Sequence, residues 1–249
     1  MPLAWYLRIF VTYKALMVNK LLYLVFFCIP FISEAKVSHE IWNQLLKKHV
    51  SEKGNVNYQG FKTDRELLDK YLFQLAKKAP DQTYSLNEEL AYWINAYNAF
   101  TIQLVLKYYP MASITNIDKP WDIPFIKIEN KTYTLNEIEH QIIRKKFNEP
   151  RIHFALVCAA TSCPKLRNEA YEAEKIEIQL LSQTTDFIND TTKNTLNKNK
   201  TILSELFSWY KEDFTKKGTL ADFINQYSKI KIEPKTKISF SQYNWKLNE

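Results

Sequence analysis

Hydrophobic residues recur every three or four positions over much of the chain, as they do along one face of an α-helix. This spacing, with capping pairs such as Ser85 with Glu88, predicts a helix-rich chain. The expected helices cover residues 38–49, 63–79, 85–109, the segment that starts at Thr134, and residues 172–189, 204–214 and 220–227. Residues 86–109 are apolar on nearly every side, so we expect them to form a buried central helix.

Shorter segments have the patterns of strands. Phe125–Thr134 alternates around Glu129-Asn130-Lys131, which predicts a hairpin. Residues 151–159 are almost wholly apolar and predict a strand that is buried on both faces. Two closing strands are expected at 230–232 and 238–240. The predicted fold class is therefore α+β: a helix-rich single domain with a small sheet, the buried central helix 86–109 and the buried strand 151–159.

The first 35 residues have the pattern of a secretory signal peptide. Lys20 precedes the apolar run Leu21–Ile32, and Ser33 and Ala35 place small residues where a signal peptidase cuts. We expect cleavage after Ala35, a protein that is exported to the periplasm or secreted, and one globular domain over 36–249. A start at Met17 remains an alternative. Contact with a membrane is expected only through this segment, if it stays uncleaved.

Composition excludes several classes of function. The chain has three glycines, too far apart for a phosphate-binding loop, so nucleotide sites are not expected. The formal charge of +7 comes from lysines that are scattered among acids, which does not indicate nucleic-acid binding. There is no His-Glu-x-x-His and no Cys-x-x-Cys. We expect no cofactor and no metal, and an unknown substrate or protein partner.

Polar residues occur on faces that should be buried. Asn95 and Asn98 belong to the central helix, and Glu139 falls on the apolar face of the next helix, beside His140. A buried amide needs hydrogen bonds, and a buried carboxylate needs a partner. Two interpretations remain open for each group. The amides either brace neighbouring backbone or orient a site, and Glu139 either forms a structural ion pair, for example with Arg151, or is a site carboxylate.

The stretch His153-Phe-Ala-Leu-Val-Cys158-Ala-Ala-Thr-Ser-Cys163-Pro164 holds the only cysteines of the predicted mature chain. On an extended strand His153 and Cys158 would face opposite sides, about 16 Å apart, so they should not form a dyad. Pro164 favours a helix start, which would place Cys163 at a helix N-terminus and activate its thiol. The cysteines could instead form a disulfide, one of them could bind a metal with His140 and His153, or both could be inert thiols.

Several motifs together resemble one family. They are residues 92–99 (YWINAYNA), Ile138-Glu139-His140 with Arg144, residues 151–158 with Ser162-Cys163-Pro164, Val56-Asn57-Tyr58, Trp209-Tyr210 with Asp213-Phe214, and the closing Tyr243–Asn248. In this order they resemble the domain of unknown function 547 family. The resemblance implies an exported bacterial protein; plant relatives carry the domain beside a coiled coil. It points to Asn95, Asn98, Glu139, His140, Arg151, His153, Cys158 and Cys163 as site residues. Asn244 stands where Asp is expected.

Two hypotheses for function follow. In the first, the protein is a cysteine-dependent hydrolase or acyl transferase, loosely analogous to papain and transglutaminases. Cys163 would be the nucleophile, His153 or His140 the base and Glu139 the orienting group, with Asn95, Asn98, Arg151 and Cys158 binding or orienting. In the second, it is a non-catalytic periplasmic binding or scaffold domain with a Cys158–Cys163 disulfide.

Overall fold

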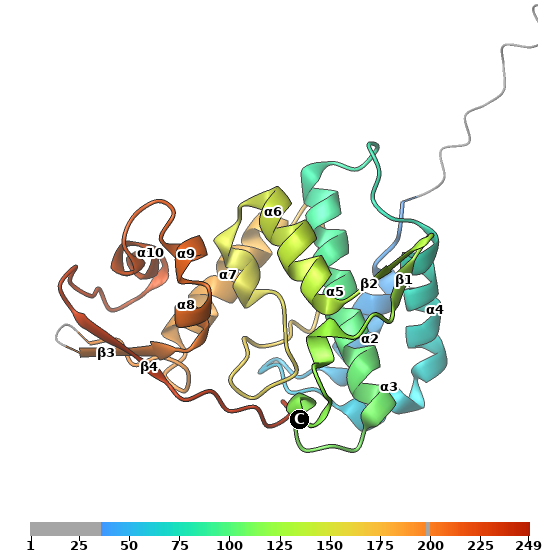
Figure 1. Cartoon of the computed structure of the whole chain (residues 1–249), viewed down its shortest axis with the longest axis horizontal. Coiled ribbons are helices and arrows are strands. Elements are labelled where there is room, and N and C mark those ends of the chain that lie inside the picture. The colour runs from blue at the N-terminus through green and yellow to red at the C-terminus, as the bar shows by residue number, and fades with distance from the viewer. Residues whose placement is uncertain (1–35, 198–199) are drawn as a thin grey trace, which may run out of the picture. The chain divides into compact units, whose positions relative to one another are not determined.

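The computed structural model describes residues 36–197 and 200–249 (Figure 1); the predicted signal segment lies outside them. Helices predominate in the described part. They are α2 (Glu40–His49), α3 (Tyr58–Thr63), α4 (Arg65–Lys77), α5 (Leu86–Tyr108), α6 (Arg144–Phe147), α7 (Ile176–Asn189), α8 (Leu206–Trp209), α9 (Lys211–Phe214) and α10 (Leu220–Tyr227). A π-helix, η3 (Glu137–Ile143), leads into α6. Three 3-10 turns are η1 (Ile114–Asn116), η2 (Pro120–Asp122) and η4 (Pro150–Phe154).

Strands are short and form two separate pairs in the described residues. The antiparallel pair is the predicted hairpin, with β1 (Ile126–Ile128) beside β2 (Lys131–Tyr133). The parallel pair is β3 (Lys200–Ser204) with β4 (Lys237–Ser241), where Leu203 lies opposite Phe240. The helix-rich α+β class is confirmed. None of the helices over 36–197 and 200–249 has the length and apolar character needed to cross a membrane.

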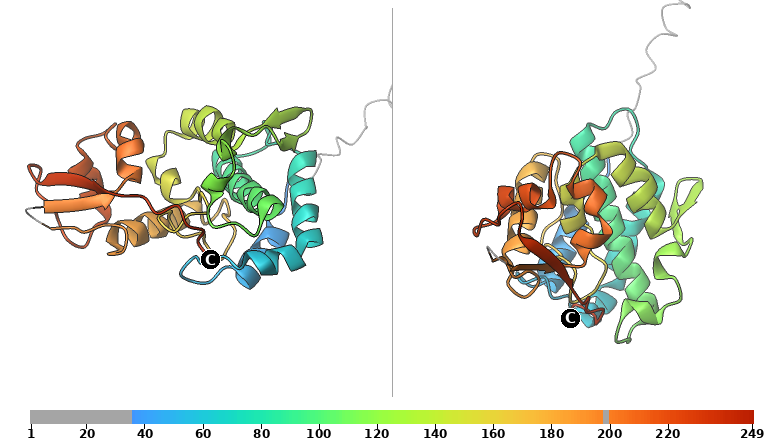
Figure 2. Two further views of the ribbon diagram at one scale, coloured as in Figure 1. Left: turned by 60° about the horizontal axis from the view of Figure 1, so that its bottom comes forward. Right: turned by 60° about the vertical axis from the view of Figure 1, so that its left-hand side comes forward.

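The central helix is where the sequence predicts it. A reciprocal capping box starts α5, with the Ser85 hydroxyl accepting from the Glu88 N–H and the Glu88 carboxylate accepting from the Ser85 N–H. The helix is buried from Leu90 to Leu106 except at Gln103, and it packs against α3, α4 and η3. Figures 1 and 2 show it running through the helical part of the domain. Burial on all sides explains why it lacks a polar face.

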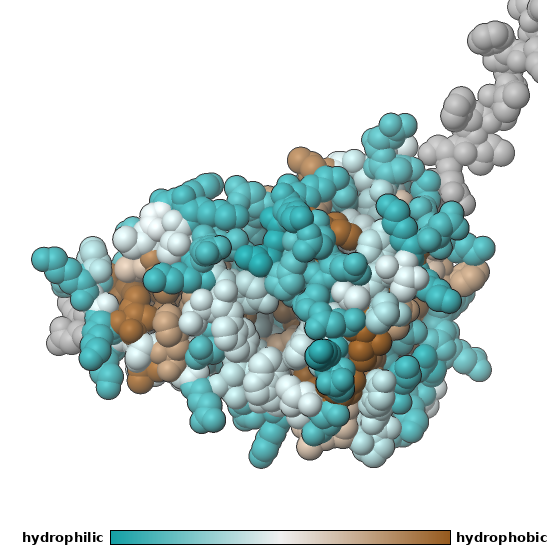
Figure 3. All heavy atoms as spheres, in the orientation of Figure 1, coloured by the Kyte–Doolittle hydropathy of each residue, from teal (hydrophilic) through white to brown (hydrophobic). Residues whose placement is uncertain are grey.

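Two hydrophobic cores share one helix. The larger core surrounds α5 and includes Ile176 and Leu180 from the first half of α7. The smaller core contains Phe187 and Ile188 from the second half of α7, together with side chains of α8 to α10. In Figures 1 and 2 the C-terminal elements accordingly lie together at the far end of α7. Most of the face shown in Figure 3 is hydrophilic, with one hydrophobic patch at the end that carries β3 and β4 and a second in the lower right half of the view.

The predicted strand over 151–159 is wrong. Pro150 opens η4, the Glu149 carboxylate accepts from the Arg151 N–H, and the chain continues without regular structure to Cys163. The expected burial is present, for example at Phe154 and Val157. A run of apolar residues indicates burial but does not determine the backbone conformation. Here the backbone hydrogen bonds that a neighbouring strand would supply come from a side chain of the central helix.

That side chain is the amide of Asn98. It donates to the Ala155 carbonyl at 2.9 Å and accepts from the Val157 N–H at 2.9 Å. Asn95 binds Tyr171 in the same way, donating to its carbonyl at 2.8 Å and accepting from its N–H at 2.9 Å. Both amides therefore satisfy buried backbone of chain segments that have no ladder partner. This arrangement fits the bracing interpretation of the two residues.

The C-terminal region is also partly different from expectation. Residues 238–240 lie in β4 as predicted, but 230–232 form no strand, and the partner of β4 is β3, which the sequence did not predict. Instead, the Asn225 amide binds both the N–H and the carbonyl of Ile232. After β4 the chain returns to the larger core, where Lys246 pairs with Ser113 and Leu247 with Ala160.

Replacing Asn98 by Ala should lower the free energy of unfolding by about 2–4 kcal/mol, because two buried backbone groups would lose their partners. Urea denaturation measures the loss. Asn87→Ala is the matched control on the same helix, where the exposed amide makes one long contact of 3.5 Å to Ala173; its effect should stay below about 0.5 kcal/mol. Equal losses for the two variants would contradict the bracing role.

Candidate functional site

A cavity of about 310 Å³ lies between η3, the segment from His153 to Pro164, α8 and the closing segment of the chain. Six aromatic side chains line it: Tyr97, Trp121, Trp209, Tyr210, Tyr243 and Trp245. Its polar lining includes Glu139, His153 and Asn136, and both Cys158 and Cys163 reach it. An apolar cavity with a few convergent polar groups is the usual form of a small-molecule site, so we call this the aromatic pocket.

Glu139 supplies the charge of the aromatic pocket. It is 5% exposed and lies on η3, whose wide π-helical turns are frequent at functional sites. The hydroxyls of Tyr97 and Tyr210 hydrogen-bond to its carboxylate. Burial raises the pKa of both tyrosines well above the usual range, and the negative charge of Glu139 raises it further. Both tyrosines are therefore neutral donors that hold the carboxylate in place.

His153 lies beside the same carboxylate. Its Nε2 lies 2.8 Å from Asp213 Oδ2, and its Nδ1 lies 4.0 Å from Glu139 Oε1. A carboxylate only accepts, so Nε2 carries the proton and Nδ1 presents a lone pair toward Glu139 when the ring is neutral. The imidazole stacks on Tyr210 with ring centroids 3.7 Å apart, which fixes its plane.

Asp213 is held by two further contacts. Arg144 Nε donates to its Oδ2 at 2.7 Å, and the Lys216 ammonium lies 3.3 Å from its Oδ1. The hydrogen bond from His153 lowers the pKa of the Asp213 carboxyl, and the Arg144 guanidinium lowers it as well. Asp213 is therefore ionised, and it fixes His153 in the tautomer that leaves Nδ1 free.

The other predicted site residues lie in different places. His140 is next to the pocket network, with its Nδ1 3.0 Å from a guanidinium nitrogen of Arg144. Arg151 does not pair with Glu139; its guanidinium binds Glu149 and Glu177 instead. Asn95 and Asn98 bind backbone and do not line the aromatic pocket. The structure thus brings together Glu139, His153, Cys158 and Cys163, with His140 beside them.

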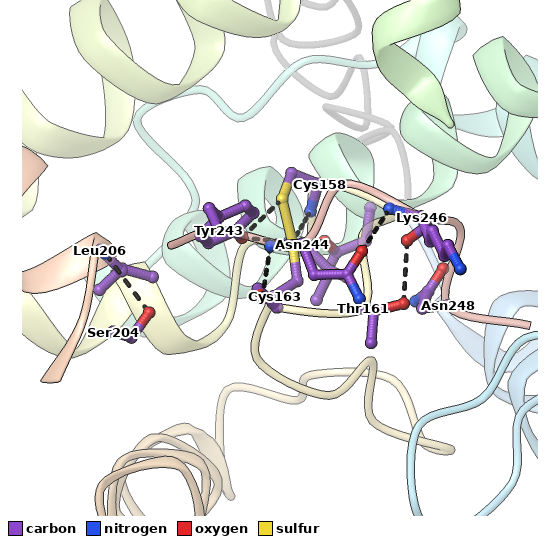
Figure 4. Close-up of a disulfide and its surroundings, with 12 residues drawn as sticks. Cys158, Thr161, Cys163, Ser204, Leu206, Tyr243, Asn244, Lys246 and Asn248 are labelled. Carbon is purple, nitrogen blue, oxygen red and sulfur yellow. Dashed lines mark hydrogen bonds between the residues drawn. A yellow bond between two sulfur atoms is a disulfide. The ribbon is translucent and has the colours of Figure 1, made fainter. Parts of the chain in front are cut away.

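The two cysteines form a disulfide. The Sγ atoms of Cys158 and Cys163 are 2.02 Å apart, and the Tyr243 hydroxyl lies 3.2 Å from each of them (Figure 4). No helix starts at Pro164, so the predicted position of Cys163 at a helix N-terminus is wrong. The expected strand geometry, with His153 and Cys158 on opposite faces, is also wrong, because the segment is not a strand and both residues line one pocket. No contact joins the two side chains among the described hydrogen bonds, as expected.

Several pocket residues were not among the predicted site residues. Trp209 and Tyr210 come from the end of α8 and the residue after it, and Tyr243 and Trp245 come from the closing segment. Asp213, which binds His153 without lining the pocket itself, comes from α9. Their motifs were visible in the sequence. Their convergence was not, because about 60 residues separate Asp213 from His153. Trp209 is 46% exposed, unusual for a large ring, and it lines the pocket.

A second cavity is larger, at about 680 Å³, but it does not combine a histidine, a buried carboxylate and several aromatic rings. It is lined by loop residues around Lys53, Lys165 and Lys193 with nearby acids, and by Gln183. The amide of Gln183 already binds the carbonyls of Phe154 and Lys165. Volume alone therefore does not make it the better candidate. Within the described residues, no three His, Cys, Asp or Glu side chains are grouped to hold a metal ion.

The buried His153 should make stability depend on pH. Burial lowers the pKa of its imidazole, although Asp213 and Glu139 oppose the shift. Below about pH 6.5 the unfolded chain gains a proton that folded His153 does not, so stability is complete above this pH and falls below it. His39, with a pKa lowered by burial to about 4, acts in the same direction.

We therefore expect the free energy of unfolding to fall between pH 7.5 and pH 5.5, with about 1 kcal/mol of the loss due to His39. His153→Asn should show a smaller loss than the wild type, and the double variant with His39→Asn a smaller loss still. Guanidinium titrations at the two pH values measure both. An unchanged pH dependence in His153→Asn would contradict a neutral buried imidazole.

Comparison with known proteins gives one match. Residues 82–188 match the model of a family described as "Protein of unknown function, DUF547". No curated protein and no solved structure matches the chain. The matched region contains Glu139, His153 and both cysteines of the pocket, whereas Asp213 and Tyr243 lie outside it. Over α5 to α7, and over half of the pocket lining, this chain resembles the DUF547 family of proteins of unknown function.

Proposed function

We propose that this protein is an exported small-molecule binding domain and that the aromatic pocket is its binding site. One observation carries the proposal: six aromatic rings converge on a buried carboxylate and an oriented imidazole in one cavity. Rings supply apolar contact area, and the few polar groups supply orientation. The pocket is pre-organised, because Tyr97, Tyr210 and Asp213 hold Glu139 and His153 in position.

Binding is favoured over cysteine catalysis by the state of the two sulfurs. A cysteine nucleophile acts as a thiolate, and neither sulfur of a disulfide is one. The cysteine-dependent hydrolase or acyl transferase is the second candidate, for a reduced form of the protein. It is supported by the shared pocket of Cys158, Cys163 and His153, and by Asp213 orienting the imidazole as in a catalytic triad.

Truncation of a pocket wall tests the binding function. Fragments that include organic cations, neutral alcohols and sugars are screened by ligand-observed NMR against the wild-type protein. For a fragment that binds, Trp209→Ala should weaken affinity about tenfold, through loss of an aromatic contact. Stability should change little, because Trp209 is 46% exposed.

Phe73→Ala is the matched control, since Phe73 is 60% exposed and lies on α4 outside the pocket lining. It should leave fragment affinity unchanged. If no fragment binds the wild type, or if binding is indifferent to Trp209→Ala, the aromatic pocket is not the binding site.

Export and oxidation of the cysteines are tested together by peptide mapping. The full chain is expressed in a bacterial host, and the fractions are digested with trypsin without reductant. We expect a mature N-terminus at Lys36 in the exported fraction. We also expect residues 152–165, which hold both cysteines in one peptide, to be two hydrogens lighter than the reduced peptide and unreactive to iodoacetamide. Absence of the protein from the exported fraction would contradict export, a retained N-terminus there would contradict cleavage after Ala35, and an alkylated peptide would favour the cysteine enzyme.

A further inference from the structure

We propose that the aromatic pocket binds a small organic cation, with Glu139 as its counter-charge and the aromatic rings as its cage. This inference rests on the proposed binding function and names its ligand class. A quaternary or methylated ammonium group fits it best. Such a group needs no hydrogen-bond acceptor around it, only a negative charge and ring faces.

Among the described residues, Glu139 makes no direct ion pair with Lys or Arg; the Arg144 guanidinium interacts with it electrostatically but binds Asp213. None of the described residues that line the pocket is Lys or Arg. Arg144 and Lys216 both bind Asp213, and Arg144 also contacts the His140 ring. The positive charges of this region therefore gather on the far side of His153, around Asp213.

The neutral groups do not replace the missing cation. Tyr97 and Tyr210 donate hydrogen bonds to Glu139 but carry no charge. His153 gives its Nε2 proton to Asp213 and presents a lone pair to Glu139 across 4.0 Å. Two acceptors therefore face each other. A buried carboxylate is costly without a counter-ion, so a cationic ligand would supply what the lining lacks.

Four of the rings contact one another and form one wall of the pocket. Tyr243 lies 4.8 Å from Trp209 and 4.5 Å from Trp245 between ring centroids, and Trp121 lies 5.5 Å from Trp245. Indole and phenol faces carry the negative part of the ring quadrupole, and Trp attracts cations most strongly. A volume of about 310 Å³ is at the small end for ligand sites, roughly 300–1,000 Å³, so the cation should be small.

The decisive comparison is between choline and 3,3-dimethylbutan-1-ol, its uncharged carbon isostere. The two have nearly the same shape, so their affinity ratio isolates the charge. Calorimetry or Trp fluorescence with wild-type protein at pH 7.5 should show choline binding at least about tenfold tighter. This measurement needs no variant and so does not depend on whether a variant folds.

Glu139→Gln then identifies the counter-charge. Choline affinity should fall on the order of tenfold, while affinity for the neutral isostere should hold or rise. Glu212→Gln is the matched control: it removes the same charge from an exposed position on α9, one residue from Asp213, and should change neither affinity.

The outcomes distinguish failure of the cation proposal from failure of the proposed small-molecule binding function. Equal affinities for choline and its isostere would overturn the cation while leaving a small-molecule pocket. The same holds if choline fails to bind but a neutral fragment from the screen binds in a Trp209-dependent way. If neither probe nor any fragment binds, the binding function itself falls. Choline selectivity that survives Glu139→Gln would overturn the role of the carboxylate.

Discussion

The pair of hydrogen bonds between Asn98 and the backbone of Ala155 and Val157 is the constraint on which the pocket depends. The segment from Ala155 to Cys163 has no helix and, beyond one isolated bridge of Ala160 with Leu247, no strand pairing, yet most of it is buried. Buried backbone groups need partners, and a central helix can supply them only through side chains. Fixing this segment, which follows His153 in the chain, helps to hold His153 and the disulfide in the lining of one pocket.

Charge then determines how the two cores meet at the pocket. Glu139 and Arg144 come from η3 and α6, His153 from η4, and Asp213 from α9. The ion pair of Arg144 with Asp213 and the hydrogen bond of His153 to Asp213 tie the C-terminal helices to the larger core. Because Asp213 has both partners, it leaves Glu139 on the pocket side with tyrosine donors alone. The site therefore has two carboxylates in different environments: Asp213 is bound by Arg144 and His153, and Glu139 faces the pocket.

Sequence reasoning recovered what local patterns determine. Ser85 with Glu88 predicted the start of α5, and the polar residue Glu139 on an apolar face pointed to the pocket. The strand over 151–159 failed because hydrophobicity cannot distinguish a buried strand from a buried loop braced by Asn98. The sequence could not predict which tyrosines and tryptophans line the pocket. Residues from α8 and the closing segment come near Tyr97 only through the tertiary fold.

The disulfide and the aromatic pocket point toward the same kind of site. Cys158 and Cys163 close a short loop against Tyr243, whose ring is part of the pocket wall. Joining the sulfurs holds this loop in place and removes the nucleophile that the pocket would otherwise offer beside His153. The features that remain are rigid rings, a buried carboxylate and an imidazole that Asp213 holds in place. They suit recognition of a charge better than transfer of an acyl group, because recognition requires complementarity but no thiolate.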